Sequence, residues 1–112
     1  MTKNIERIIN SQCSDRRGKV FNFKNYSIEN FHILTMEPGS VRGNHTHDKD
    51  EILCVIDGKG ICEIIIEDKN SGKVKKFNVK EHIEIFRIKK GIKHTLRNKG
   101  NKLFYLVCFL VI

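Results

Sequence analysis

Short apolar segments broken by turn signals are the feature of this sequence that most limits its fold. The turns recur about every 8 to 12 residues, and no segment carries the helical periodicity of a convincing long helix. The segments that read as strands are 20–23, 30–36, 41–47, 51–56, 61–67, 74–79, 83–88, the stretch around His94, and 103–112. About nine short strands of this kind predict an all-β sandwich or barrel.

Three connecting segments carry specific predictions. Residues 57–60 read Asp-Gly-Lys-Gly, which favours a tight hairpin between the strands 51–56 and 61–67. Residues 14–19 are polar and predict a turn ahead of the first clear strand. The segment 5–12 fits either a helical turn or an early strand, and the pattern does not decide between them.

Size and charge limit the function. A chain of 112 residues has room for one small domain, 1–112, and not for two. Its 21 Lys and Arg against 13 Asp and Glu give a net charge of +8, which favours anionic partners such as phosphate-bearing metabolites. The charges are interspersed along the chain, and only residues 73–76 and 89–93 are locally dense in positive charge. A solvent-exposed face would account for both runs. Nothing resembles a DNA-reading module, so we expect no nucleic-acid partner.

No segment indicates export or membrane insertion. The first residues lack the apolar core of a signal peptide, and the apolar run 103–112 is about half of the roughly 20 residues that a membrane helix needs. That run is apolar on both faces of a strand, so we expect a partner to cover one face in a homodimer. The four cysteines form no CxxC pair, which favours reduced thiols in a cytoplasmic protein.

Three histidines and a glutamate define a candidate metal site. His45 and His47 are two residues apart, so on one strand their imidazoles share a face, about 6.6 Å apart along the backbone. Glu51 follows a polar triplet that suits a turn, and His94 lies far downstream. Imidazole and carboxylate suit divalent Zn, Ni, Mn or Fe. Taken singly, each residue could be an exposed polar side chain, but a sheet that closes on itself would bring all four together.

The spacing of these residues resembles the two motifs of the cupin superfamily. The first motif is matched at every fixed position, by Gly39, His45, His47, Glu51 and Gly58. The second is matched at most positions, by Gly91, His94 and Asn98. Lys89 stands where the second motif has Pro, and Ile83 where it has Gly. The resemblance implies a small double-sheet jelly-roll barrel with the site inside its mouth.

A narrower resemblance concerns cupins that act on nucleotide-linked sugars. Residues 41–45 resemble the RG-x-H segment of the dTDP-sugar 3,5-epimerases and the dTDP-4-keto-sugar 3,4-ketoisomerases, and 15–18 loosely resemble their D-x-R-G turn. The RGNH-x-H phrase that begins at Arg42 is similar to the C-terminal cupin domain of capsular polysaccharide assembling proteins. These likenesses imply an isomerase or epimerase of an anionic sugar nucleotide in polysaccharide biosynthesis.

Departures from these enzymes favour a metal-bound site. The 3,5-epimerases carry Gln at the position of His47 and use no metal, and the ketoisomerases have Lys at the position of Asp48 and no ligand at Glu51. The capsule-assembly domain, which keeps the metal, is fused to a reductase. These 112 residues contain none, so a separate reductase would have to act on an epimerised keto sugar.

The chemistry needs a base that removes a proton α to a carbonyl and an electrophile that stabilises the enolate. A metal on the four ligands could polarise the carbonyl. Without a metal, His45 is the candidate base. Tyr105 is the candidate proton donor, although its parity with Leu103 and Val107 also suits core packing.

Substrate binding is assigned to Arg42 and Asn44. Arg42 could hold a diphosphate through its bidentate fork, or it could form a surface salt bridge. It stands three residues before His45, so it faces the other side of the strand unless Gly43 breaks the pleat with a bulge.

Two other classes of function fit the same residues. A metal-dependent oxygenase or decarboxylase of a small acid would use the same four ligands. A non-catalytic cupin would bind a small molecule and report it to another chain.

Overall fold

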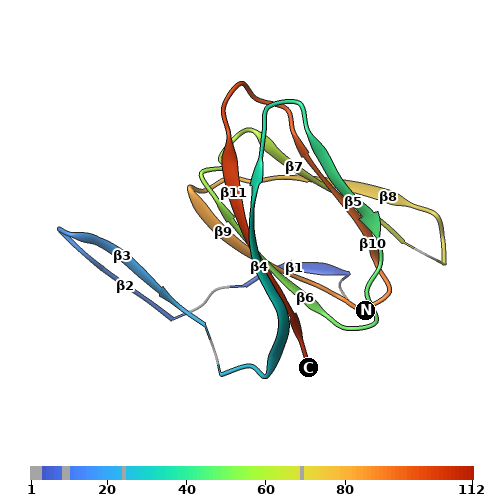
Figure 1. The fold of residues 1–112 in the computed structure, drawn as a ribbon, viewed down its shortest axis with the longest axis horizontal. Helices are drawn as coiled ribbons and strands as arrows, with labels where there is room; N and C mark the ends of the chain where they lie inside the picture. The colour runs from blue at the N-terminus through green and yellow to red at the C-terminus, as the bar shows by residue number, and fades with distance from the viewer. Residues whose placement is uncertain (1–3, 9–10, 24, 69) are drawn as a thin grey trace.

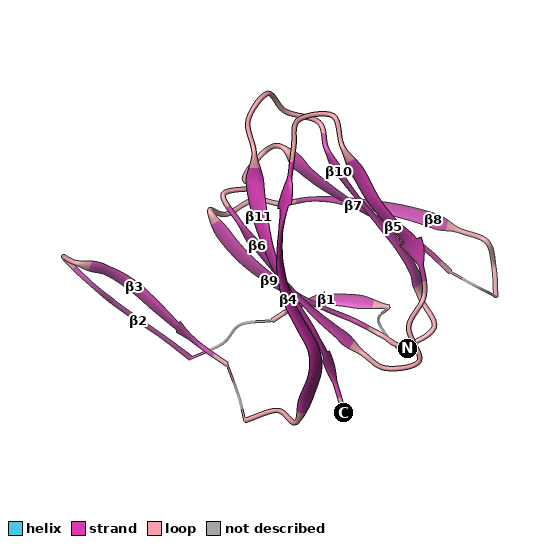
Figure 2. Cartoon of the chain, in the orientation of Figure 1, coloured by secondary structure: helices cyan, strands magenta, loops and turns pink. Residues whose placement is uncertain are grey.

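The computed structural model describes residues 4–8, 11–23, 25–68 and 70–112, which form eleven strands and no helix (Figure 2). The strands are β1 (Ile5–Arg7), β2 (Ser11–Asp15), β3 (Gly18–Asn22), β4 (Ile28–Met36), β5 (Val41–His45), β6 (Glu51–Ile56), β7 (Cys62–Glu67), β8 (Val74–Asn78), β9 (Ile83–Ile88), β10 (Lys93–Asn98) and β11 (Phe104–Val111). Within these ranges, no helix is long and apolar enough to cross a membrane.

Two antiparallel sheets enclose the core. A five-stranded sheet has the order β1-β9-β6-β11-β4, and a four-stranded sheet has the order β5-β10-β7-β8. Figure 1 shows them curving around a common interior, with the edge strands β4 and β5 joined at one end by a turn. This is the double-sheet jelly-roll barrel that the strand pattern and the cupin resemblance predict.

Alternation along the strands builds the core between the sheets. On β11, Phe104, Leu106 and Cys108 are buried in it, and Leu53 and Val55 of β6 pack into the same cluster. Successive strand residues point to opposite faces, so every second residue reaches this interior. Each large apolar side chain buried there stabilises the fold by about 1.5–3 kcal/mol.

The outer face of the five-stranded sheet is also apolar, and the chain's own N-terminal part covers it. Phe109 of β11 is buried in a second cluster, with Phe21 of β3 and Tyr26 packed against that cluster. The ring centroids of Phe23 and Phe109 lie 5.7 Å apart, nearly edge to face. The second face of 103–112, which the sequence assigned to a partner chain, is thus covered in large part within one chain.

The N-terminal segment differs from the prediction in its strands. The described part of 5–12 contains β1 and the start of β2, and β2 extends into the predicted polar turn at 14–19. It pairs with β3 as a two-stranded hairpin that projects from the barrel (Figure 1). Strands this short and polar carry no apolar alternation, so the sequence pattern yielded about nine strands where the described residues form eleven.

The prediction of a hairpin at 57–60 is wrong. β6 pairs with β9 and β11, whereas β7 pairs with β10 and β8, so this connection carries the chain from one sheet to the other. Asp57 and Gly60 have positive φ values of 65° and 74°. The amide of Asp57 donates to the carbonyl of His82, not to a partner across a hairpin. Turn residues indicate where the chain changes direction but not which strand it then pairs with.

The described thiols are free and buried. Cys54, Cys62 and Cys108 form no disulfide. Burial raises the pKa of Cys54 to about 11 and, with nearby carboxylates adding to the effect, the pKa of Cys62 and Cys108 to about 12. Thiols in this state act as small apolar groups in the core. The side chain of Cys13 lies outside the described residues.

Candidate metal centre and adjoining cavity

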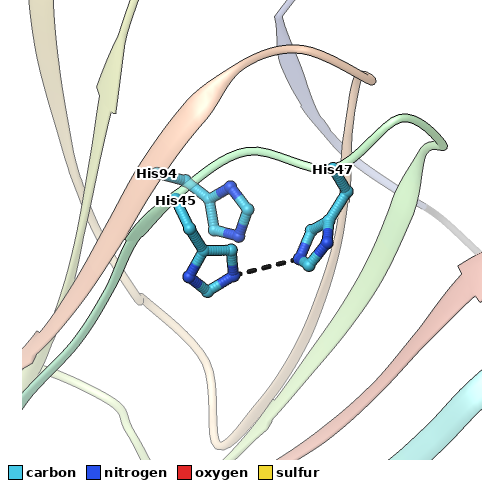
Figure 3. A group of neighbouring side chains, drawn as sticks. All are labelled: His45, His47 and His94. Carbon is cyan, nitrogen blue, oxygen red and sulfur yellow. Dashed lines mark hydrogen bonds between the residues drawn. The ribbon is translucent and has the colours of Figure 1, made fainter.

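Four separate positions in the fold supply the predicted ligands. His45 ends β5, His47 lies in the loop that follows, Glu51 begins β6, and His94 is on β10. β5 and β10 are paired neighbours, and His94 stands directly opposite His45 in their register. Figure 3 shows the three imidazoles turned toward one another. The convergence that the sequence predicted is therefore present, but His47 lies beyond the end of the strand that was predicted to carry both histidines.

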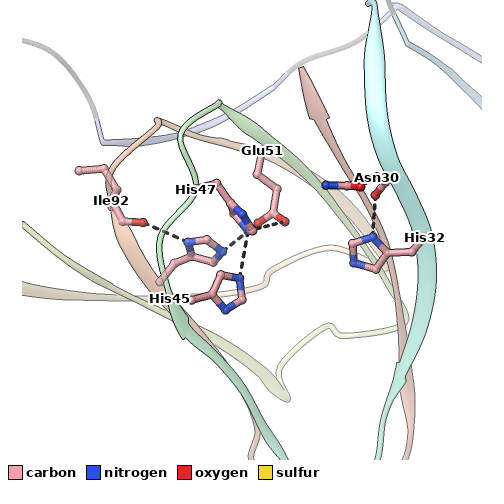
Figure 4. A network of polar contacts seen from close by, with 7 residues as sticks. Asn30, His32, His45, His47, Glu51 and Ile92 are labelled. Atoms are coloured by element: carbon pink, nitrogen blue, oxygen red, sulfur yellow. Dashed lines mark hydrogen bonds and ion pairs between the residues drawn. The ribbon is translucent and has the colours of Figure 1, made fainter. Parts of the chain in front are cut away.

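The distances are those of one cluster. One ligand atom from each of His45, His47 and His94 lies within 4.8 Å of the others. The Nε2 atoms of His45 and His47 are 3.0 Å apart. Glu51 completes the group, with one carboxylate oxygen 2.8 Å from Nε2 of His94 and the other 3.6 Å from Nε2 of His47 (Figure 4).

A β-bulge in β5 lies next to His45 and sets the direction of its side chain. The pairing with β10 runs His94 to His45 and then Thr95 to Gly43, so Asn44 is the extra residue. Gly43 and Asn44 have φ values of 105° and 63°. A Cβ on Gly43 would lie 2.6 Å from the carbonyl oxygen of His94, so only glycine fits there.

The same bulge decides where Arg42 faces. Arg42 pairs with Leu96, whose side chain is buried in the core. Directly opposite residues of an antiparallel pair project to the same face. Arg42 therefore shares the interior face with His45 despite the odd spacing, at an exposed position of the edge strand. Of the two orientations that the sequence left open for Arg42, the one with a broken pleat at Gly43 is therefore present.

The members of the cluster differ in how far they are exposed to solvent. His94 and Glu51 keep only 2% and 6% of their surface exposed, whereas His45 is open to solvent. Burial lowers the pKa of His94, but the hydrogen bond and charge of Glu51 outweigh it and leave that pKa above its ordinary value. The pKa of His47 is lowered, first by burial and then by the neighbouring imidazoles, against the opposing charge of Glu51.

The donor set suits a divalent cation. Nδ1 of His94 lies 3.1 Å from the carbonyl oxygen of Ile92 and donates to it, so a neutral His94 presents the lone pair of Nε2 to the Glu51 carboxylate. Two acceptors 2.8 Å apart need a proton or a cation between them. A backbone acceptor that fixes the imidazole in this way is typical of histidine metal ligands, and imidazole with carboxylate suits Zn, Ni, Mn or Fe.

A cavity of about 330 Å³ adjoins the cluster. It is lined by Asn30, Phe31, His32, His47, Glu51 and Leu110. Sequence reasoning missed the contribution of β4, because no motif marks that strand. The only signal was a histidine between the apolar residues Phe31 and Ile33.

The structure does not bring Tyr105 to this cavity. Its neighbours Phe104 and Leu106 point into the core, so Tyr105 faces the outer side of the sheet with Val107 and is 40% exposed. It neither contacts the histidines nor packs in the core of its own chain.

The fold and the histidine motif together define a cupin. The chain belongs to the family described as the polysaccharide biosynthesis C-terminal domain, whose sequence model matches residues 13–111. No curated protein matches the chain by sequence.

Solved structures share the fold over nearly the whole chain. The 3,4-ketoisomerase QdtA from Thermoanaerobacterium thermosaccharolyticum, in complex with TDP-4-keto-6-deoxyglucose, is 15% identical with a TM-score of 0.75, over 100% of this chain and 83% of that one. The TDP-fucose-3,4-ketoisomerase WlaRA from Campylobacter jejuni is 19% identical with a TM-score of 0.72, over 98% and 84%. NovW, a 4-keto-6-deoxy sugar epimerase from Streptomyces spheroides, is 16% identical with a TM-score of 0.69, over 96% and 63%.

Proposed function

We propose that the protein is a metal-dependent isomerase or epimerase of a nucleotide-linked 4-keto sugar in polysaccharide biosynthesis. The observation that carries this proposal is the cluster of three imidazoles and Glu51 beside a cavity of about 330 Å³. The family and the reactions of the structurally similar ketoisomerases and epimerases support it.

The proposed metal ligands are His45, His47, Glu51 and His94. A divalent ion held there would act as a Lewis acid that polarises the substrate carbonyl. An imidazole that gives its lone pair to an ion cannot also accept a proton, so His45 is either a ligand or a base. Elemental analysis of protein purified without chelator decides between these roles. We expect about one ion per chain and a higher melting temperature on adding Zn, Ni or Mn; less than a tenth of an equivalent with no change in melting temperature would rule out the metal.

Arg42 is proposed to bind the diphosphate of the substrate, with Asn44 beside it. The register supports this role, because Arg42 shares a strand face with His45, and the net charge of +8 favours a dianionic ligand.

The test of the function is proton exchange. Incubation with TDP-4-keto-6-deoxyglucose in deuterated water should introduce deuterium at a ring carbon next to the carbonyl, which mass spectrometry and NMR detect. TDP-glucose, which has no keto group, serves as the control and should gain none. Oxygen uptake or release of carbon dioxide from small acids would indicate the oxygenase or decarboxylase class instead. Tight binding without exchange would indicate a non-catalytic cupin.

We also propose a homodimer in the cytoplasm. Phe31 and Ile33 of β4 and Val20 on the projecting hairpin are more than half exposed, and a second copy could cover them. The free thiols fit a reducing compartment. Sedimentation that shows a monomer at micromolar concentration would contradict the dimer.

A further inference from the structure

The proposed metal site leaves the reaction without a base. If His45, His47, Glu51 and His94 all give lone pairs to an ion, none of them is free to take a proton from the substrate. Of the six described residues that line the cavity, His32 is the one with a titratable side chain outside this ligand set. We propose that His32 is the acid–base residue of the reaction, acting from the β4 wall of the cavity. This inference rests on the proposed function.

A second bulge turns His32 inward. The pairing of β4 with β11 runs Cys108 to His32 and then Leu110 to Glu29, so Asn30 and Phe31 together face Phe109. Asn30 has a φ of 55°, in the left-handed region. His32 stands opposite Cys108, whose side chain belongs to the core, and therefore faces the barrel interior. Bulges that redirect a side chain in this way are frequent beside active sites.

One hydrogen bond sets the tautomer of His32. Its Nδ1 lies 2.7 Å from the carbonyl oxygen of Asn30. A carbonyl can only accept, so Nδ1 carries the proton and neutral His32 keeps its lone pair on Nε2. Figure 4 shows that second nitrogen on the side of the ring that faces the histidine cluster. Histidine is the residue most often used for general acid–base catalysis.

An ion pair holds the β4 wall and the ligand loop together. Nζ of Lys49, between His47 and Glu51, lies 2.6 Å from a carboxylate oxygen of Glu29 on β4. Glu29 is next to Asn30, so the pair spans the two walls at the edge of the cavity. The pair therefore links the strand that carries His32 to the loop that carries His47.

The proton balance closes without any added oxidant. The C–H bond next to the carbonyl breaks, its proton passes to Nε2 of His32, and the electron pair forms the enolate as the carbonyl oxygen gains negative charge. In an isomerisation, the proton on Nε2 exchanges with water, because His32 is exposed, and Nε2 then delivers a solvent-derived proton to the former carbonyl carbon. The adjacent hydroxyl passes its proton to the enolate oxygen, which becomes a hydroxyl, and its own carbon becomes the new carbonyl. In an epimerisation, water in the open cavity supplies the proton to the other face, and His32 releases its own to solvent.

The test is His32→Gln, assayed for deuterium uptake from solvent into TDP-4-keto-6-deoxyglucose. We expect uptake and product formation to fall by at least about 100-fold, the lower end for loss of general acid–base catalysis. Metal content, TDP affinity and melting temperature should stay at the wild-type level, because His32 is exposed. Free imidazole should restore part of the rate in the variant. His82→Gln, an exposed histidine in the turn before β9, is the matched control and should keep the full rate.

Three results would overturn the role of His32. The variant could retain a rate within threefold of wild type, it could lose metal together with activity, or its loss could resist rescue by imidazole; the last two would show a structural role. If the wild-type protein itself exchanges no deuterium, the proposed function fails and the role of His32 falls with it. The wild-type arm therefore separates the two failures.

Discussion

The edge strands β4 and β5 both contain a β-bulge beside a histidine, but only the bulge in β5 is indicated by the sequence. Each belongs to the edge of its sheet, and each has a register shift beside an asparagine of positive φ, Asn30 or Asn44. Each bulge sits within two residues of an inward-facing histidine. In β5 a glycine accompanies the asparagine and the histidines recur at fixed spacing, whereas β4 has neither mark.

The difference reflects how tightly each wall is constrained. On the β5 side, Gly43 lies against the backbone of β10 and three imidazoles converge on a common point, so few residues fit. On the β4 side, the hydrogen bond of His32 goes to a backbone carbonyl that any residue at position 30 would offer. The sequence therefore predicts the β5 side of the site but not the β4 side.

The largest effect is expected when the contributions of His94 and His32 to stability are compared. His94→Ala removes the partner of a buried carboxylate, and breaking such a pair costs about 3–5 kcal/mol. His32→Ala, at an exposed position, should change stability by less than about 0.5 kcal/mol. Urea unfolding measures both, and elemental analysis should find metal lost only in the first variant. Equal costs would show that the cluster does not stabilise the β5 side.

The second prediction concerns the face of Arg42. Arg42→Ala should weaken TDP binding by about 1.5–3 kcal/mol, the range for hydrogen bonds to charged groups, without changing metal content. Arg97 of β10 pairs with Val41 and is one residue away from the buried Leu96, so it faces outward and is the matched control. Calorimetric titration should show Arg97→Ala binding as wild type does. Equal weakening of both variants would point to general charge attraction in place of a clamp.

The sequence was sufficient for the barrel and for the convergence of His45, His47, Glu51 and His94, since these depend on periodicity and on residue spacing. It offered the bulge at Gly43 only as one of two alternatives. It was insufficient for β1 and β2, which are short and polar, and for the crossing after β6, where Asp57 and Gly60 signal a turn but not its destination. Tyr105 shows a further limit. Strand parity separated it from its neighbours, but only the pairing of β11 shows which of the two faces is the interior.

A third prediction tests whether the β5 bulge is obligatory. Gly43→Ala places a Cβ against the carbonyl oxygen of His94 at a φ of 105°, and backbone strain alone costs about 1–3 kcal/mol. Gly72→Ala, at a φ of 69° in the β7–β8 turn and with open space around it, carries the strain without the clash. We expect Gly43→Ala to unfold at lower urea than Gly72→Ala and to lose metal. Identical midpoints with retained metal would mean that β5 can pair without the bulge.

The smallest effect is expected at the unmarked bulge. Asn30 holds a left-handed conformation that costs most residues about 1–2 kcal/mol but glycine almost nothing. Asn30→Ala should therefore destabilise the fold by about 1 kcal/mol, whereas Asn30→Gly should stay near wild type and keep the carbonyl that accepts the proton of His32. Urea unfolding of the two variants gives the comparison, and deuterium uptake by Asn30→Gly should remain close to the wild-type rate. If alanine and glycine are equally tolerated, β4 does not keep its left-handed bulge in solution, and the inward orientation of His32 must have another cause.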